Sequence, residues 1–327
     1  MGLRQRLAVL VLTAGLCGSG VLVAAVIAQD ARAAGAQRYQ KAPADTLRVV
    51  LLGTAGGPQA RFDQFGISTL VEAGDVRMLF DCGRGATLRL AQLGVPLASV
   101  DRLLLTHLHS DHVVQVPDLL ISGWATGRNR PLEVWGPAGT RDMLQAFLRA
   151  FQFDIHLRRD IDEKIPGAGI EVIEHEVSEG TVFERAGVRV SAFLVDHGPV
   201  APVFGYRVEH KGRSVVLSAD TRPSDNLVRH AQGTDVLIHS VIDVAPLRAM
   251  GAPDGVIAAI VAHHSTPEQA AGVFARVKPR LAVYSHANAS QAVLDETRAI
   301  YPGRVQGPED LLTIDIGSEV TVRRAGP

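Results

Sequence analysis

The stretch His107-Leu108-His109-Ser110-Asp111-His112 comes directly after an apolar run that extends from Arg102 to Thr106. An apolar run of this length predicts a buried strand, and a strand that emerges into a loop is where a rigid scaffold presents functional side chains. Three imidazoles and a carboxylate in so short a stretch suit a borderline divalent metal ion, zinc above all. The sequence therefore predicts a metal site at a strand end.

The composition is that of a globular protein with a large core. The chain has 327 residues, 46% of them hydrophobic, and a formal net charge of -1 at pH 7. A nearly neutral chain has no global basic field that would hold a polyanion by counterion release. The charge balance therefore argues against nucleic acid as the main partner.

Short apolar runs separated by Gly, Pro, Asp or Asn recur along the chain and predict strands. They are Leu47–Leu52, Ser68–Ala73, Arg77–Asp81, Arg102–Thr106, Leu132–Trp135, Val188–Val195, Phe204–Val208, Ser214–Ser218, Val236–His239 and Leu281–Ser285. Helical periodicity occurs between them, at Ala86–Leu93, Thr140–Phe151, Pro267–Val277 and Gln291–Ala299. Strands with helices inserted in both halves of the chain predict an α/β fold with helices outside the sheets. Because no linker divides the region after residue 45, residues 46–327 are predicted to form one domain.

The first residues have the pattern of an export signal. Arg4 and Arg6 precede an uncharged apolar stretch, Leu7 to Ile27, and small residues follow it. Residues 1–34 are expected to be a cleaved signal peptide or a retained membrane anchor, and residues 35–45 a linker. The domain would then be exported, and periplasmic, extracellular or membrane-anchored. Contact with the membrane would be limited to an uncleaved N-terminal segment.

The motif of residues 107–112 resembles the signature of the metallo-β-lactamase superfamily, and other motifs extend the resemblance from about residue 48 to 290. In chain order these motifs are similar to those of the ribonuclease Z and MBL-type arylsulfatase branch: Gly53–Pro58, Phe80–Gly85, Gly136–Thr140, Asp196–Gly198, Gly205–Arg207, Ser218–Asp220, His264–Thr266 and Ser285–His286. The resemblance implies a four-layer αββα metallo-β-lactamase sandwich.

The resemblance also implies a binuclear zinc site with two Zn²⁺ per chain. The ligands would be three imidazoles for the first ion, an aspartate and two imidazoles for the second, and a bridging aspartate: His107, His109 and His197; Asp111, His112 and His286; and Asp220. Two such ions activate a bridging hydroxide as nucleophile. Asp111 is the expected acceptor of the water proton.

The resemblance makes His264 the candidate general acid, and His263 beside it is the alternative. In ribonuclease Z a Glu after an earlier strand-end His orients this acid. Here Ser240 follows His239 at that place, so the orienting carboxylate is missing, and Asp243 is a candidate substitute.

The substrate predicted from the sequence is a small phosphate or sulfate ester. Ribonuclease Z inserts a long arm for transfer RNA between the third motif His and the bridging Asp, whereas here two strands take up the segment from His197 to Asp220. A phosphodiesterase or arylsulfatase-like hydrolase therefore leads. The alternatives are a ribonuclease Z-like endonuclease for the 3′ end of transfer RNA, a lactonase or β-lactamase-type acyl hydrolase, and a non-catalytic zinc-stabilised binding protein of the cell envelope.

Two segments without a site motif are expected to form loops over the metals: Trp124–Pro131 and Ala245–Ala262. Trp124 and Arg128 are candidates for contact with an anionic aromatic substrate, with ordinary surface positions as the alternative. The sequence leaves a homodimer open.

Overall fold

The computed structural model describes residues 40–287 and 289–324, which belong to one compact unit, Gln37–Pro327. The predicted export segment, residues 1–34, lies outside the described residues. Among the residues that are described, every helix is too short or too polar to span a bilayer.

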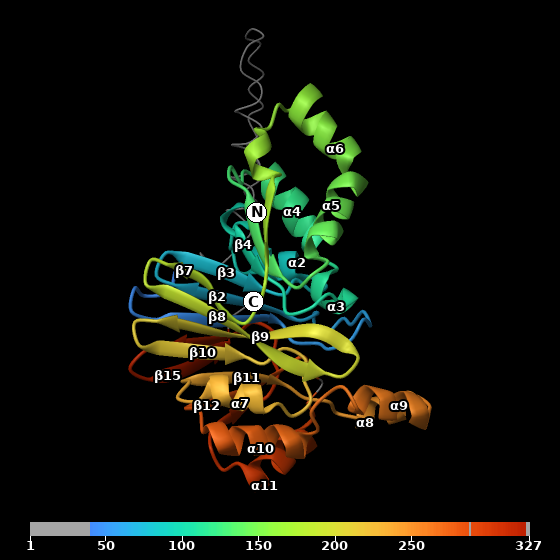
Figure 1. Cartoon of the computed structure of the whole chain (residues 1–327), viewed down its shortest axis with the longest axis vertical. Coiled ribbons are helices and arrows are strands. Elements are labelled where there is room, and N and C mark those ends of the chain that lie inside the picture. The colour runs from blue at the N-terminus through green and yellow to red at the C-terminus, as the bar shows by residue number, and fades with distance from the viewer. Residues whose placement is uncertain (1–39, 288, 325–327) are drawn as a thin grey trace, which may run out of the picture. The chain divides into compact units, whose positions relative to one another are not determined.

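Two mixed sheets form the centre of this unit (Figure 1). The strands of the first sheet are β1 (Leu47–Gly53), β2 (Ser68–Ala73), β3 (Val76–Phe80), β4 (Arg102–Leu104), β5 (Leu132–Gly136), β6 (Val172–Glu176), β14 (Leu312–Ile316) and β15 (Val320–Arg324). Those of the second are β7 (Gly180–Arg185), β8 (Val188–His197), β9 (Val200–His210), β10 (Arg213–Leu217), β11 (Val236–Ser240), β12 (Leu281–Ser285) and β13 (Val305–Gln306). The strand orders are β15-β14-β1-β2-β3-β4-β5-β6 and β13-β12-β11-β10-β9-β8-β7.

Helices cover the outer faces of both sheets (Figure 1). On the side of the first sheet lie α2 (Ala86–Gln92), η1 (Leu97–Ser99), α3 (Ser110–Val113), α4 (Val116–Ala125), α5 (Thr140–Ala150), α6 (Gln152–His156), η2 (Leu157–Ile161) and η3 (Gly167–Gly169). On the side of the second sheet lie α7 (Asp225–Ala231), α10 (Pro267–Val277) and α11 (Gln291–Ile300), whereas α8 (Ala245–Ala249) and α9 (Asp254–Val261) extend beyond the sheets (Figure 1).

The buried side chains form three apolar layers that hold this arrangement together. One lies between the sheets and includes Leu51, Met78 and Val283. The others lie between a sheet and its helices, around Trp124 and around Phe274. Burying each large apolar side chain stabilises the fold by about 1.5–3 kcal/mol. The predicted αββα sandwich in a single domain is confirmed.

Strand ends meet at one edge of the two sheets. In the first sheet β3 and β4 are parallel, and in the second β10, β11 and β12 are parallel, so their carboxyl ends point the same way. Three residues just beyond these ends have positive φ angles: Asp81 (55°), Ala219 (61°) and His286 (51°). Such backbone conformations are costly for residues other than glycine and are concentrated at functional sites.

The described part of the predicted linker lies against the sheets. Arg48 of β1 donates a hydrogen bond to the carbonyl of Gln40 at 2.5 Å, and Lys211 pairs with Asp45 at 2.6 Å. Ala42 is buried. Residues 40–45 are thus attached to the domain rather than separate from it.

Trp124 and Arg128 are buried inside the fold, so the expectation that they contact substrate is wrong. The indole of Trp124 donates to the carbonyl of Pro166 at 2.9 Å. The Arg128 guanidinium donates to the carbonyls of Leu119, Leu120 and Gly169. Burial lowers the pKa of Arg128 to about 10. The two side chains fix the end of α4 and the loop packed on it.

We expect Arg128→Ala to lower the free energy of unfolding by about 3 kcal/mol, because buried carbonyls lose their donors. Thermal unfolding followed by circular dichroism measures the change. Arg141→Ala is the control, since Arg141 forms an exposed pair with Glu174 that contributes less than about 1 kcal/mol. A raised KM with an unchanged melting temperature would instead place Arg128 at the substrate.

Candidate metal centre

The structure brings all seven predicted ligands together at the shared strand edge. Two groups have ligand atoms within 4.8 Å of one another: His107, His109, His197 and Asp220; and Asp111, His112 and His286. A third group of the same kind joins His264 to Asp220 and His286. Side chains from both sheets, separated by up to 179 positions in the chain, thus form one cluster.

The cluster is buried on one side and open on the other. His107, His112, His197 and Asp220 are each at most 2% exposed. His109 is exposed, and it contacts His107 through ring nitrogens 2.9 Å apart. A small ligand can therefore reach the cluster without any opening of the core.

Asp81 orients His112. Its carboxylate accepts hydrogen bonds from the Thr106 N–H at 2.9 Å and from the Thr106 hydroxyl, and it lies 2.8 Å from the Nδ1 of His112. A carboxylate on one ring nitrogen directs the other nitrogen towards a metal. The Nε2 of His112 is buried and has no hydrogen-bond partner among the described residues. Buried polar atoms are rarely left without a partner. This nitrogen is therefore a candidate ligand atom for a metal ion.

Burial and neighbouring charges set the protonation of these side chains. Burial opposes the charge of Asp220, but His286 and His112 outweigh it and hold the pKa of Asp220 well below its ordinary value. Burial also opposes the charge of His112, yet Asp81 and Asp220 raise its pKa well above the ordinary value. Burial lowers the pKa of His107. At neutral pH the cluster thus holds an ionised carboxylate, a neutral imidazole and a proton on His112 that a metal must displace.

These donors fit a divalent metal ion. Imidazole nitrogens and carboxylate oxygens are the ligands that zinc prefers in hydrolytic sites. The protein supplies positioned donors from a rigid strand edge, and the orphan nitrogen of His112 faces Asp220 at 3.5 Å. The residues present thus fit a metal site.

Replacing Asp81 by Asn is expected to weaken metal binding by roughly 10–100-fold, since the His112 ring loses its orienting carboxylate. Isothermal titration of the metal-free protein with Zn²⁺ measures the affinity. Asp101→Asn is a matched control, because Asp101 is also buried but pairs with Arg102 on the first sheet. Equal zinc affinities of the Asp81 variant and the unaltered protein would contradict this role.

The loop after β1 supports the site from the other side. The N–H of Gly57 donates to Asp111 at 2.9 Å, and a Cβ on Gly56 would lie 2.8 Å from a ring nitrogen of His286. Burial opposes the charge of Asp111, but His286 and His112 lower its pKa. Gly56 is therefore needed for the close approach of the loop to His286.

Asp310 anchors this loop, and sequence reasoning missed it. It accepts hydrogen bonds from the N–H groups of Thr54 and Phe65 and pairs with Arg89. Asp310 lies in no motif and is far from the loop in the chain, so the sequence carried no signal for this contact. A second missed contact orients His197, whose Nδ1 lies 2.9 Å from the carbonyl of His263.

Of the two candidate acids, His264 lies within the cluster. Its ring centroid is 4.8 Å from that of His197, and burial lowers the pKa of His264 to about 4. Asp243 does not replace the missing carboxylate: it accepts from the N–H groups of Ala245 and Ser290. His239 lies fully buried in β11, where its Nδ1 is 2.6 Å from the carbonyl oxygen of Ser240.

A cleft of about 510 Å³ opens on the cluster. One wall is the glycine loop with Arg61, and the other comes from the segment predicted to cover the metals: Pro246, Leu247, Met250 and Ile260. The segment Ala245–Ala262 thus lines the cleft as predicted, but it forms helices α8 and α9 instead of a loop. The prediction is wrong for Trp124–Pro131, whose residues do not line the cleft.

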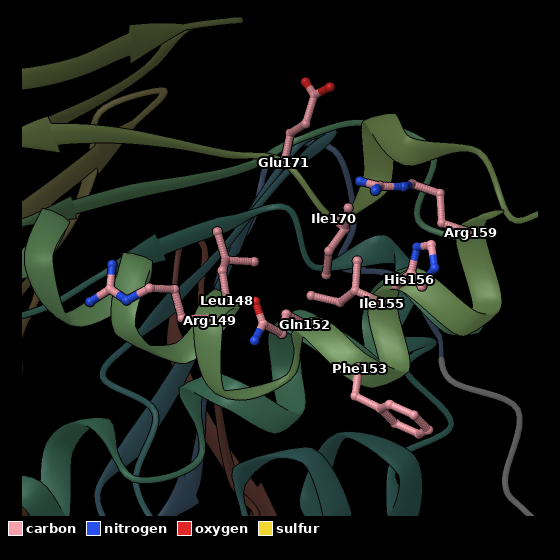
Figure 2. A pocket seen from close by; sticks show the side chains of 9 residues that line it. All are labelled: Leu148, Arg149, Gln152, Phe153, Ile155, His156, Arg159, Ile170 and Glu171. Carbon is pink, nitrogen blue, oxygen red and sulfur yellow. The ribbon is translucent and has the colours of Figure 1, made fainter.

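A second hollow, of about 720 Å³, lies at α5, α6 and η2 (Figure 2). Figure 2 shows Leu148, Ile155 and Ile170 grouped in it, with Arg159 and His156 nearby. His156 is paired with Asp160, and none of the described metal-binding groups lies there. The smaller cleft, which contains the convergent histidines and aspartates, is therefore the candidate active site.

Comparison with known proteins agrees with this fold. A family model described as a beta-lactamase superfamily domain matches residues 76–287. The chain is 38% identical over 285 residues to the ribonuclease Z of Mycobacterium marinum, covering 83% of this chain and 99% of the relative. It is 40% identical over 247 residues to the ribonuclease Z of Mycobacterium bovis, covering 73% of this chain and 85% of that relative.

Solved structures share the fold. The metallo-β-lactamase fold protein YhfI from Bacillus subtilis superimposes with a TM-score of 0.65 at 18% identity, covering 83% of this chain and all of YhfI. The short form of human tRNase Z gives 0.62 at 22% identity, covering 82% and 98% of the two chains. At these identities the likeness concerns the fold alone.

These relatives correct the predicted partner. The sequence argument for a small-molecule ester and against nucleic acid is wrong, because the curated relatives are ribonucleases. The short segment between His197 and Asp220 misled, since the alignment spans 99% of the Mycobacterium marinum ribonuclease Z despite it. Net charge misled as well, since an active-site metal supplies local positive charge that a chain total does not register.

The motifs, the sandwich fold, the convergent ligands and the relatives lead to one assignment. This chain belongs to the metallo-β-lactamase superfamily of metal-dependent hydrolases, in the branch that includes ribonuclease Z.

Proposed function

We propose that this protein is a binuclear zinc phosphodiesterase that cleaves RNA near the 3′ end of precursor transfer RNA. The observation that carries the proposal is the coincidence of two features. The chain aligns with nearly the whole length of a ribonuclease Z at 38% identity, and its candidate ligands for two ions converge in one open cluster.

The ligands divide between two positions. His107, His109 and His197 would hold one ion, Asp111, His112 and His286 the other, and the buried carboxylate of Asp220 lies between them. When bound, two zinc ions supply an activated water and positive charge for the phosphodiester oxygens.

Two side chains of the cleft are placed to handle protons. Asp111 is ionised and held by the Gly57 N–H, so it can accept a proton from the attacking water. His264 is neutral in the free protein. The negative charge of a bound phosphodiester favours its protonated form, and we assign it donation of a proton to the leaving oxygen.

The N-terminal segment stays a prediction that bears on this function. Export would separate the enzyme from cytosolic precursor RNA and leave it extracytoplasmic RNA as substrate. Cell fractionation of the full chain, with N-terminal sequencing of the mature protein, distinguishes a cleaved signal from an anchor.

The test of the proposed function is a substrate panel with the zinc-loaded full chain. We expect precursor transfer RNA to be cleaved with a kcat/KM at least about 1000-fold above that for an aryl sulfate, a lactone or a β-lactam, since the latter lack the phosphodiester that the two-metal clamp fits. Asp111→Asn serves as the inactive control. Faster turnover of the sulfate or of an acyl substrate would overturn the proposal.

A further inference from the structure

One wall of the cleft is apolar although it is not part of the core. We define the apolar wall as Pro246, Leu247, Met250 and Ile260, which come from α8, α9 and the turn after α8. Helix α8 has no buried residue, and α9 has only Ile257. Met250 is 59% exposed.

The position of these helices agrees with a role outside the core. Figure 1 shows α8 and α9 extending to the side of the two sheets instead of covering a sheet face. Exposed apolar surface beside a site commonly marks contact with a ligand. The sequence of α9, Asp254–Val261, is apolar over most of its length, yet the fold leaves that surface to the cleft and the solvent.

The opposite wall has different chemistry. It consists of the glycine loop, whose Gly57 would place an added Cβ in open space, and of Arg61, which pairs with Asp63 at 2.9 Å. Five of the candidate ligands line the same cleft: His109, Asp111, His197, Asp220 and His286. A ligand that suits this cleft would thus have an anionic group, which binds at the ligand cluster and beside Arg61. It would also have an apolar part, which packs against Leu247 and Met250.

A nucleotide combines an anionic part and an apolar part in this way. Its phosphate is anionic, and a base that has left the helical stack buries its faces against apolar or aromatic side chains. Met is well suited to such contact because it is polarisable and adapts its shape. The cleft volume of about 510 Å³ is within the range of sites that enclose a ligand of nucleotide size.

The wall has little capacity to read which base is present. Its four side chains carry no hydrogen-bond donor, and their one acceptor is the weak thioether sulfur of Met250. Asp243, the carboxylate beside it in the cleft, has its oxygens on the N–H groups of Ala245 and Ser290. Contact with the wall therefore selects for an unstacked base and not for its identity.

We propose that the apolar wall binds the unstacked nucleobase next to the scissile phosphodiester. This inference rests on the proposed RNA cleavage. It makes Leu247 and Met250 determinants of substrate specificity that select single-stranded RNA at the cleavage position, whatever base stands there.

The experiment is a double-mutant cycle between protein and substrate. The zinc-loaded full chain and the variant Leu247→Ser/Met250→Ser cleave a precursor transfer RNA and the same RNA with an abasic nucleotide beside the cleavage site. Val256→Ser on α9 is the matched control, because Val256 is 48% exposed and does not line the cleft. Zinc content and thermal unfolding establish that each variant is folded and loaded.

We expect either change alone, in the wall or in the base, to lower kcat/KM on the order of 10-fold, and both together to lower it little further. Val256→Ser should cleave both RNAs as the unaltered protein does. The inference is overturned if the unaltered protein cleaves both RNAs equally, or if the wall variant loses the same factor on each. If the unaltered protein cleaves neither RNA, the proposed function fails and the inference fails with it.

Discussion

Asp220→Asn is expected to lower RNA cleavage by at least roughly 1000-fold, the largest single effect in the molecule. Asp220 is 2% exposed and its carboxylate faces His112, His197 and His286 at 3.2–3.9 Å. Asparagine keeps the size of the side chain but removes the negative charge that would hold the proposed zinc ions there. Several kcal/mol of electrostatic stabilisation would be lost, which corresponds to this factor in rate.

The measurement combines kcat/KM on precursor transfer RNA with zinc analysis of the purified variant. Asp225→Asn is the matched control, because Asp225 is an exposed aspartate paired with Arg276 away from the cleft. We expect full activity for this control. Zinc content and cleavage that survive in the Asp220 variant would remove Asp220 from the centre.

Removal of the metal is expected to lower the melting temperature by roughly 10 °C. A ligand that binds only the folded state at about 1,000 times its Kd stabilises that state by about 4 kcal/mol. The physical reason lies in the ring nitrogens and carboxylates gathered at the strand edge. Without a cation the buried Nε2 of His112 has no partner among the residues the structure describes.

Thermal unfolding before chelation, after chelation and after zinc is restored provides the test. The Asp220→Asn variant should show a smaller difference between its two states, since it binds zinc weakly. If chelation left the melting temperature unchanged, no bound metal would stabilise the fold, and the protonated histidines and the aspartates alone would account for the folded cluster.

Much of the fold could be predicted from the sequence because the buried strands are nearly continuous apolar runs. All ten predicted runs coincide with strands. Five strands were missed: β6, β7, β13, β14 and β15. β13 has only two residues, and the others mix their apolar residues with polar ones, as in Val-Ile-Glu-His-Glu of β6 and Leu-Thr-Ile-Asp-Ile of β14. Helix α8 and helix α9 were missed because an apolar stretch beside a cleft lacks the polar face that periodicity needs.

The candidate site was predictable for a different reason. The resemblance to the metallo-β-lactamase superfamily implied the ligand set, and Asp220 and His286 also follow parallel strands whose carboxyl ends meet at one edge. The supporting contacts were not predictable, since Asp310 acts on Thr54 through backbone N–H groups that carry no sequence signal. Arg128 was misassigned because the sequence does not distinguish an arginine that faces a cleft from one that donates hydrogen bonds to buried carbonyls.

The substrate was the weakest prediction, and its error has a physical cause. A missing arm and a net charge of -1 both describe the chain as a whole, whereas the phosphodiester meets only the local cleft. That cleft is lined by the candidate metal ligands, by Arg61 and by the apolar wall.

The most direct test of the central claim is to map the cut in precursor transfer RNA at single-nucleotide resolution. The zinc-loaded full chain is compared with its Asp220→Asn variant. The account predicts one metal-dependent cut near the 3′ end of the mature sequence, absent from the variant. Intact RNA, or scattered cuts that the variant also makes, would contradict it.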